Sequence, residues 1–143
     1  MTDMSVASLQ EFLDGAFPID TPYVIEAVDD ASIDVRLVVG PGHGRPGDTI
    51  SGPSLMALVD TAAWLAILAQ IGPVVLAVTT SLHIDFLRKP ALVDLAAKAT
   101  LLKLGRTLAV VDVSIFSVGH TNMVAKAQVT YAIPTPKDES THQ

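Results

Sequence analysis

The chain has 143 residues, of which 50% are hydrophobic and 17% are charged. This length suits one domain with a real core, and this composition excludes intrinsic disorder. The formal net charge is −6 and no run of basic residues occurs, so nucleic acid is a poor partner, because phosphate contacts need clustered Lys and Arg. We expect a single domain over residues 1–143, with surplus apolar surface buried in a homo-oligomer.

The chain contains no cysteine. This excludes disulfides, thiolate metal sites and cysteine nucleophiles, and it fits a reducing compartment. The four histidines are scattered without metal-ligand spacing, so we expect no metal site. The first residues are acidic and lead into no apolar segment, which argues against a secretory signal. We therefore expect a cytoplasmic protein.

The N-terminal part of the chain predicts a short helix and two strands. Residues 5–14 have amphipathic helical spacing, and Gly15 and Pro18 end that helix, so that residues 1–20 form a helix and its lead-in. Residues 23–28 are a candidate strand. Residues 32–39 alternate apolar and polar side chains, as a half-buried strand does. Residues 40–47 are rich in Gly and Pro and predict a loop.

The central segment predicts one long helix. Pro53 suits its first turn, either Ser51 or Gly52 can cap it, and Gly72 followed by proline ends it. Residues 54–71 are almost all apolar and about long enough to span a bilayer. A central aspartate costs about 2.5–3.5 kcal/mol on insertion scales, so we interpret the segment as a buried core helix and expect no membrane partner. Apolar residues cover every face of it, so other structure must surround it.

After the helix the hydrophobic period changes to two. Four strands are expected: from residue 74 to the break at Lys89–Pro90, 95–104, 107–117 and 122–133. In the first of them, Thr79, Ser81, His83 and Asp85 are expected on one face. The polar tail, residues 134–143, is expected to be flexible. Strands grouped beside a helix favour the α+β class, with a mostly antiparallel sheet curved around that helix.

Two motifs are incomplete, one for nucleotide binding and one for a serine nucleophile. Gly42 and Gly47 have the spacing of a phosphate-binding loop, but Asp48 stands where that loop needs Lys. Met56 stands where a nucleophile elbow around Ser54 would need its second Gly. Neither nucleoside triphosphate binding nor serine-nucleophile chemistry is therefore indicated.

Asp60 is the candidate for chemistry because it is the only ionisable residue between Asp48 and His83. An unpaired carboxylate among apolar residues is costly, so it must be paired, hydrogen-bonded or placed at a cavity. Two interpretations stay open at this point. Asp60 is either a base or nucleophile beside a cavity, or a structural group that ties the helix to backbone N–H groups.

Three segments resemble the hot-dog thioesterase superfamily, particularly the branch of the phenylacetate-pathway and hydroxybenzoyl-CoA thioesterases. They are residues 51–62, residues 82–90 (Leu-His-Ile-Asp-Phe-Leu-Arg-Lys-Pro) and residues 104–109 (Leu-Gly-Arg-Thr-Leu-Ala). The family has His-Gly-Gly, a helix bearing Asp or Glu, a strand ending in Phe-Leu-Arg-Pro, and then Gly-Arg-Thr. The resemblance implies a hot-dog fold, a curved antiparallel sheet wrapped around a long central helix.

The resemblance also implies an activity, acyl-CoA thioester hydrolysis with no cofactor beyond the CoA of the substrate. The helix carboxylate of the family falls on Asp60, and its oxyanion-binding amide falls on Gly52. The strand residue that orients water in the family falls nearest Thr79. The family's His is replaced by Ser51, and its second glycine by Pro53.

The family further implies contacts with CoA and an assembly. Arg88, Lys89, Arg106 and Thr107 lie where the family contacts the CoA phosphates. The family forms dimers whose sheets join edge to edge, and those dimers pair, so a homodimer or homotetramer is expected. Because Ser51 and Pro53 depart from the pattern, a non-catalytic acyl-CoA-binding protein is the alternative function. A hydratase ranks lower because no His lies on or just before the helix.

Overall fold

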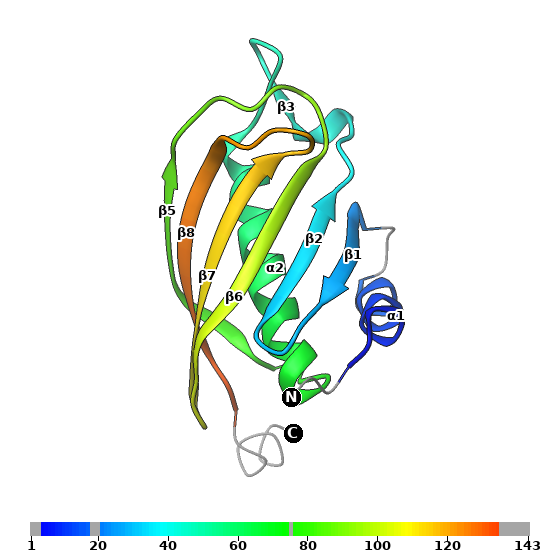
Figure 1. The fold of residues 1–143 in the computed structure, drawn as a ribbon, viewed down its shortest axis with the longest axis vertical. Coiled ribbons are helices and arrows are strands. Elements are labelled where there is room, and N and C mark those ends of the chain that lie inside the picture. Colours follow the sequence, from blue (N-terminus) through cyan, green and yellow to red (C-terminus); the bar gives the residue numbers. More distant parts are fainter. Residues whose placement is uncertain (1–3, 18–20, 75, 135–143) are drawn as a thin grey trace.

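The computed structural model describes residues 4–17, 21–74 and 76–134 of the chain. One antiparallel sheet curves around one long helix (Figure 1). The elements are α1 (Val6–Ala16), β1 (Tyr23–Val28), β2 (Ser32–Leu37), a 3-10 turn (Pro41–His43), β3 (Gly44–Arg45), β4 (Thr49–Ile50), α2 (Gly52–Ile71), β5 (Val78–Phe86), β6 (Leu95–Leu104), β7 (Leu108–Ser117) and β8 (Met123–Ala132).

The six long strands are ordered β1-β2-β6-β7-β8-β5, and every neighbouring pair is antiparallel. β1 and β5 are the two edges of this sheet, while β3 and β4 form a separate two-stranded ribbon. Short turns join β6, β7 and β8 in sequence. The α+β class and the antiparallel sheet predicted from the hydrophobic pattern are confirmed.

Helix α2 fills the concave side of the sheet, behind β6 and β7 in Figure 1. Ten of its residues are buried, and they meet the inward side chains of the strands. By length and hydropathy α2 could span a membrane, but a core helix passes the same test, and over half of it is buried inside the protein. The interpretation of this segment as the core helix is therefore confirmed.

Helix α1 lies beside β1 at the edge of the sheet (Figure 1). Leu9 and Leu13 of α1 are fully buried. The side chain of Gln10 bridges to the backbone of β1, since its amide donates to the carbonyl of Tyr23 (3.1 Å) and its carbonyl oxygen accepts from the N–H of Ile25 (2.7 Å). This side chain acts as a partner for part of the β1 edge and fixes α1 against it.

Several boundaries differ from those expected. The second strand ends at Leu37 rather than residue 39, because the Val39 N–H donates to the carboxylate of Asp94 (2.9 Å) instead of to a strand. The loop at residues 40–47 holds the 3-10 turn and β3. The first helix continues through Gly15, and the first strand after α2 begins at Val78 rather than residue 74. Of the flexible tail expected at residues 134–143, all but Pro134 lies outside the described residues.

One expected strand face is wrong. The pairing of β5 with β8 shifts between Thr79 and Ser81, where β5 carries one extra residue. Such a bulge changes the face on which side chains project. Thr79 therefore points toward α2, where it contacts Asp60, while Ser81, His83 and Asp85 do not share its face. The architecture as a whole is the hot-dog fold that the motifs predicted.

Candidate functional site

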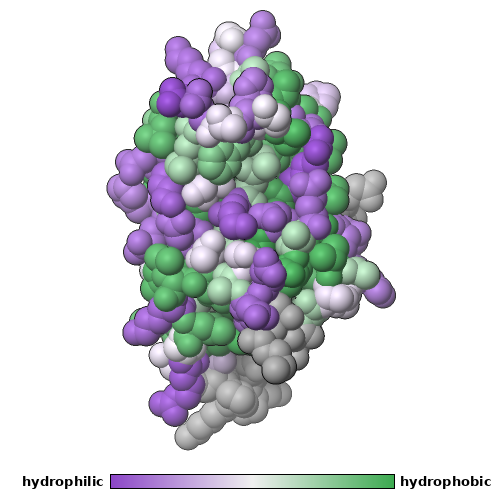
Figure 2. Space-filling view, in the orientation of Figure 1, coloured by the Kyte–Doolittle hydropathy of each residue, from purple (hydrophilic) through white to green (hydrophobic). Residues whose placement is uncertain are grey.

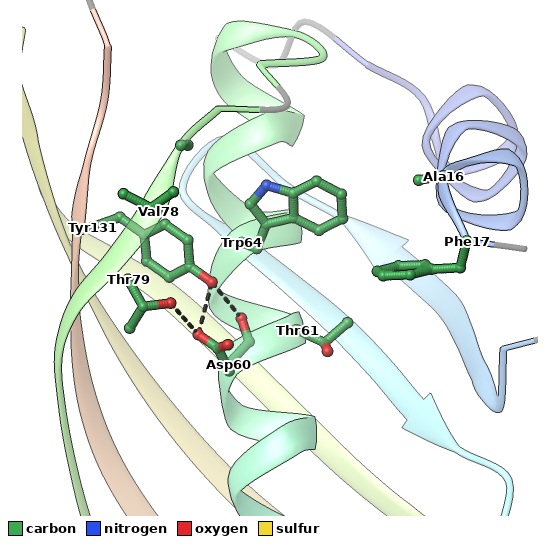
Figure 3. A pocket seen from close by; sticks show the side chains of 9 residues that line it. Ala16, Phe17, Asp60, Thr61, Trp64, Val78, Thr79 and Tyr131 are labelled. Carbon is green, nitrogen blue, oxygen red and sulfur yellow. Dashed lines mark hydrogen bonds between the residues drawn. The ribbon is translucent and has the colours of Figure 1, made fainter.

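Asp60 lies midway along α2, half-buried beneath the edge of the sheet. One of its carboxylate oxygens, Oδ1, accepts two hydrogen bonds, from Thr79 Oγ1 (2.6 Å) and from the hydroxyl of Tyr131 (2.7 Å) (Figure 3). The same hydroxyl lies 3.0 Å from the carbonyl oxygen of Asp60. Two strands therefore hold the carboxylate in one position.

The sheet register explains why these groups meet. Thr79 of β5 is paired with Tyr131 of β8, so the two hydroxyls start from neighbouring positions. Tyr131 belongs to the inward row of β8 and is buried. The bulge after Thr79 adds the second hydroxyl to this inward row. Without it, the polar side chains of β5 would lie on the outer face.

The second carboxylate oxygen of Asp60 accepts no hydrogen bond from any residue that the structure describes. Asp60 forms part of the wall of a cleft of about 370 Å³. The lining is mainly apolar and aromatic, and consists of Ala16, Phe17, Asp60, Thr61, Trp64, Ala77, Val78, Thr79 and Tyr131. An apolar cleft with a few convergent polar groups is the usual form of a small-molecule site.

The two tyrosines near Asp60 are held in their neutral form. Burial raises the pKa of the Tyr131 phenol far above its usual value, and the hydrogen bond and negative charge of Asp60 raise it further. Burial likewise raises the pKa of Tyr23, and the charge of Asp60 adds to this. At neutral pH Tyr131 is therefore a hydrogen-bond donor and Asp60 is its acceptor, which leaves the carboxylate as the only proton acceptor of this cluster.

The N-terminus of α2 carries the second predicted feature. Ser51 is the N-cap, and its hydroxyl oxygen accepts the N–H of Ser54 (3.2 Å) and lies 2.8 Å from the Ser54 hydroxyl. Gly52 is the first helical residue, where a backbone N–H has no partner within the helix. A side chain at Gly52 would meet the ring of Phe86 at 3.6 Å, so this amide lies beside the end of β5.

Gly52 and Asp60 do not meet within one chain. Eight residues of α-helix separate them, which corresponds to about 12 Å along the axis. Among the predicted catalytic residues, the structure therefore brings Thr79 to Asp60, and it leaves Ser51 and Gly52 at the far end of the same helix.

The predicted CoA-binding residues fall into two groups. All four are exposed. Arg88 and Lys89 follow the end of β5, whereas Arg106 and Thr107 precede β7, next to the position where β5 begins, because Val78 and Leu108 both pair with Ala132. The length of β5, about 26 Å for its eight steps, separates the two groups within one chain.

Tyr131 and Trp64 are parts of the site that the motifs did not indicate. A hydroxyl in the otherwise apolar inward row of β8 was the available signal for Tyr131, because a buried Tyr hydroxyl usually needs a partner. Trp64 has helical spacing of four from Asp60, which places both on one side of α2. Among the described residues, no group of three His, Asp or Glu side chains could hold a metal ion.

Comparison with known proteins shows the family of this chain. The family model of the thioesterase superfamily matches residues 47–124. A structure of a candidate thioesterase from Silicibacter sp. TM1040 is 43% identical, covers 94% of this chain and 95% of that chain, and superposes with a TM-score of 0.88.

Two more distant structures share the fold. The PaaI protein of the phenylacetic acid degradation operon of E. coli is 22% identical over 92% of this chain and 97% of its own, with a TM-score of 0.75. A thioesterase-type protein from Streptococcus pneumoniae, solved with coenzyme A, is 24% identical over 91% of this chain and 97% of its own, with a TM-score of 0.71. The match over residues 47–124, which contains α2 and β5, shows that this chain belongs to the thioesterase superfamily.

Proposed function

We propose that this protein is an acyl-CoA thioesterase in which Asp60 activates the water that attacks the thioester. The observation that carries the proposal is a carboxylate held by two hydroxyls in the wall of an apolar cleft. Both hydrogen bonds use Oδ1, so the other oxygen is available to accept a proton from water. Thr79 and Tyr131 orient the carboxylate and add no competing base.

The reaction needs two further events. As water adds to the thioester carbon, its proton passes to Asp60, and the carbonyl oxygen becomes an oxyanion. The C–S bond then breaks, the electron pair leaves on sulfur as CoA thiolate, and the carboxylic acid product remains. An unpaired backbone N–H at a helix N-terminus is well suited to stabilise the oxyanion, and Gly52 offers one.

Because Gly52 and Asp60 of one chain are about 12 Å apart along α2, both can act on one thioester only if they come from two chains. We propose a homodimer formed by antiparallel pairing of two β5 strands. β5 is a nine-residue edge whose terminal residues Val78 and Phe86 are 55% and 51% exposed. An exposed edge of this length is a template for pairing with another strand. Pairing of the dimers into a tetramer remains part of the same proposal.

The same pairing would bring together the two groups of basic residues. In an antiparallel β5 pair, the end of one strand lies beside the start of the other. Arg88 and Lys89 of one chain would then approach the turn that holds Arg106 in the second chain. Cationic side chains gathered at the mouth of the cleft are needed to bind the CoA phosphates, because the protein as a whole carries a net charge of −6. The CoA-bound Streptococcus protein of the same fold supports this choice of substrate.

The proposal is tested by thiol release from a panel of straight-chain and aryl acyl-CoAs, comparing the native protein with Asp60→Asn. Asparagine keeps the shape of the side chain and its acceptor oxygen but cannot take a proton from water. We expect kcat to fall by about 10²–10⁴-fold, the usual contribution of a general base. The matched control is Asp112→Asn, since Asp112 is bonded to Lys126 and does not line the cleft.

Equal turnover by native protein and Asp60→Asn would refute the role of Asp60. A second function, acyl-CoA binding without hydrolysis, is favoured by one observation. Ser51 stands where the family has His, and its hydroxyl is used to cap α2. Acyl-CoA binding in calorimetry without thiol release by the native protein would establish that second function instead.

A further inference from the structure

The cleft beside Asp60 is lined by two aromatic side chains, Trp64 of α2 and Phe17 after α1. Trp64 lies one helical turn after Asp60 on α2 and lines the same cleft. Phe17, directly after α1, lines it from the opposite side, with Ala16 beside it (Figure 3). No motif and no similarity to the family indicated a role for either aromatic residue.

The ring of Trp64 packs against two phenylalanine rings, those of Phe12 and Phe17. The ring of Trp64 lies 6.0 Å from that of Phe12 and 6.3 Å from that of Phe17, the latter in an edge-on arrangement. Such pairs are favourable beyond the area that they bury. Behind them, α1 is held by its buried leucines and by the hydrogen bonds of Gln10 to β1. Contacts with α1 and with the residue after it therefore hold one side of the Trp64 indole.

We propose that Trp64 sets the maximum length of the acyl group that this protein accepts. The inference rests on the proposed function, because it assumes that the thioester lies at Asp60. From there an acyl chain that follows α2 has about one helical turn, roughly 5 Å, before it reaches the indole. The cleft is mainly apolar, so short acyl groups fit and longer ones meet the ring. Trp64 is thus a specificity-determining residue that takes no part in the reaction itself.

The test uses a series of acetyl-, butyryl-, hexanoyl-, octanoyl- and decanoyl-CoA with the native protein, Trp64→Ala and Trp64→Phe. The control is Phe116→Ala, because Phe116 is an aromatic residue of β7 that does not line this cleft. Thermal unfolding of each variant establishes that it is folded. Two readouts are measured, kcat/KM from thiol release and affinity for the matching non-hydrolysable thioether analogues by calorimetry.

We expect the native kcat/KM to be greatest for short acyl groups and to fall steeply once the chain reaches Trp64. A mismatch of one methylene in an apolar pocket changes specificity by about 10–200-fold. Trp64→Ala should move the maximum toward longer chains, with the short substrates retained, and Trp64→Phe should move it less. Phe116→Ala should keep the native profile.

An unchanged length profile in folded, active Trp64→Ala would overturn the inference while leaving the thioesterase proposal intact. If the native protein releases no thiol, the proposed hydrolysis fails. The affinities for the thioether analogues then test the inference, because Trp64→Ala should still shift the preferred acyl chain to a greater length. A native preference for decanoyl over butyryl chains in both readouts would also overturn it, since Trp64 would then not limit the chain.

Discussion

At Asp60, one carboxylate oxygen accepts hydrogen bonds from two hydroxyls on two different strands. Hydrogen bonds to an ionised acceptor are roughly twice as strong as those between neutral groups. They fix the rotamer of a side chain that apolar neighbours alone would leave free to turn. Because burial raises the pKa of Tyr131, its hydroxyl stays protonated and remains a donor to Asp60.

Tyr131 is expected to act on the reaction through Asp60. Tyr131→Phe removes one donor to Oδ1 and leaves the ring in place, so kcat should fall by about tenfold with little change in KM, which corresponds to about 1.4 kcal/mol. The measurement is the steady-state rate with a good acyl-CoA substrate. Tyr23→Phe is the matched control, since it removes the only other tyrosine hydroxyl and none bonded to Asp60. Equal losses in both variants would contradict a positioning role for Tyr131.

Asp94 gives the protein an acid-sensitive contact away from the site. The N–H of Val39 and the guanidinium of Arg36 hold the pKa of the Asp94 carboxyl below its usual value. A lowered folded-state pKa stabilises the protein fully above the unfolded value near 4, and this stabilisation disappears as the pH falls through the folded value.

Asp94→Asn should therefore lower the free energy of unfolding by about 1 kcal/mol at neutral pH, a modest figure because the ion pair is partly exposed. The difference in free energy of unfolding between Asp94→Asn and the native protein should shrink as the pH falls below about 4. Urea unfolding between acid and neutral pH measures it. An exposed aspartate, Asp30, provides the control substitution Asp30→Asn. A difference that grows toward acid pH would show that the assigned contact is wrong.

Among the elements, α2 combines structural and functional requirements. Most of its length is apolar and fills the sheet, Asp60 lies midway along it, and its N-terminus presents the unpaired N–H of Gly52. Ser51 caps the start of the helix and leaves the backbone N–H of Gly52 free of a partner within the helix. A side chain at Gly52 would narrow the space beside this amide, because it would contact the ring of Phe86.

Loss of the α2 cap should cost stability. Ser51→Ala removes the oxygen that accepts the Ser54 N–H, and we expect the free energy of unfolding to fall by about 1 kcal/mol. Ser54→Ala is the control, since it keeps that backbone N–H and its bond to Ser51, and it should cost less. Chemical unfolding followed by circular dichroism compares the two. A larger loss in Ser54→Ala would mean that the cap is not the stabilising interaction.

Strand β5 shows how far an element can be predicted from its sequence. Its apolar alternation identified the strand, but a strict period of two put Thr79 on the same face as Ser81. The bulge between them is a property of the pairing with β8 and has no signature in the isolated segment. The hydrogen bond of Thr79 to Asp60 therefore became visible only when both strands were in place.

For the whole molecule, the exposed β5 edge is the most direct route to self-association. On the face shown in Figure 2, groups of hydrophobic residues are interspersed with hydrophilic ones. The ends of β5, in contrast, expose Val78 and Phe86 next to unpaired backbone groups. Pairing of two such edges would bury both.

The double substitution Ser81→Glu with His83→Glu should dissociate the dimer, because like charges on facing strands repel each other. Multi-angle light scattering should then report a mass near the 15.0 kDa of one chain, and thioesterase activity should fall with the loss of the second chain. The control is Val24→Glu on the opposite edge strand, β1. Together with Glu26 it places two charges at the same spacing along the strand, and it should leave the mass unchanged. A native protein of 15.0 kDa would refute the dimer.

The sequence by itself determined the fold class and the core helix, and it singled out Asp60 as the candidate group, because these follow from hydrophobic period, capping residues and the cost of a lone carboxylate. Only the tertiary structure decided what surrounds that carboxylate. Thr79, Tyr131 and Trp64 come from three separate elements, and their meeting depends on strand register, one bulge and the position of α2. Periodicity describes each element alone, whereas such a site arises from the packing of elements far apart in the chain.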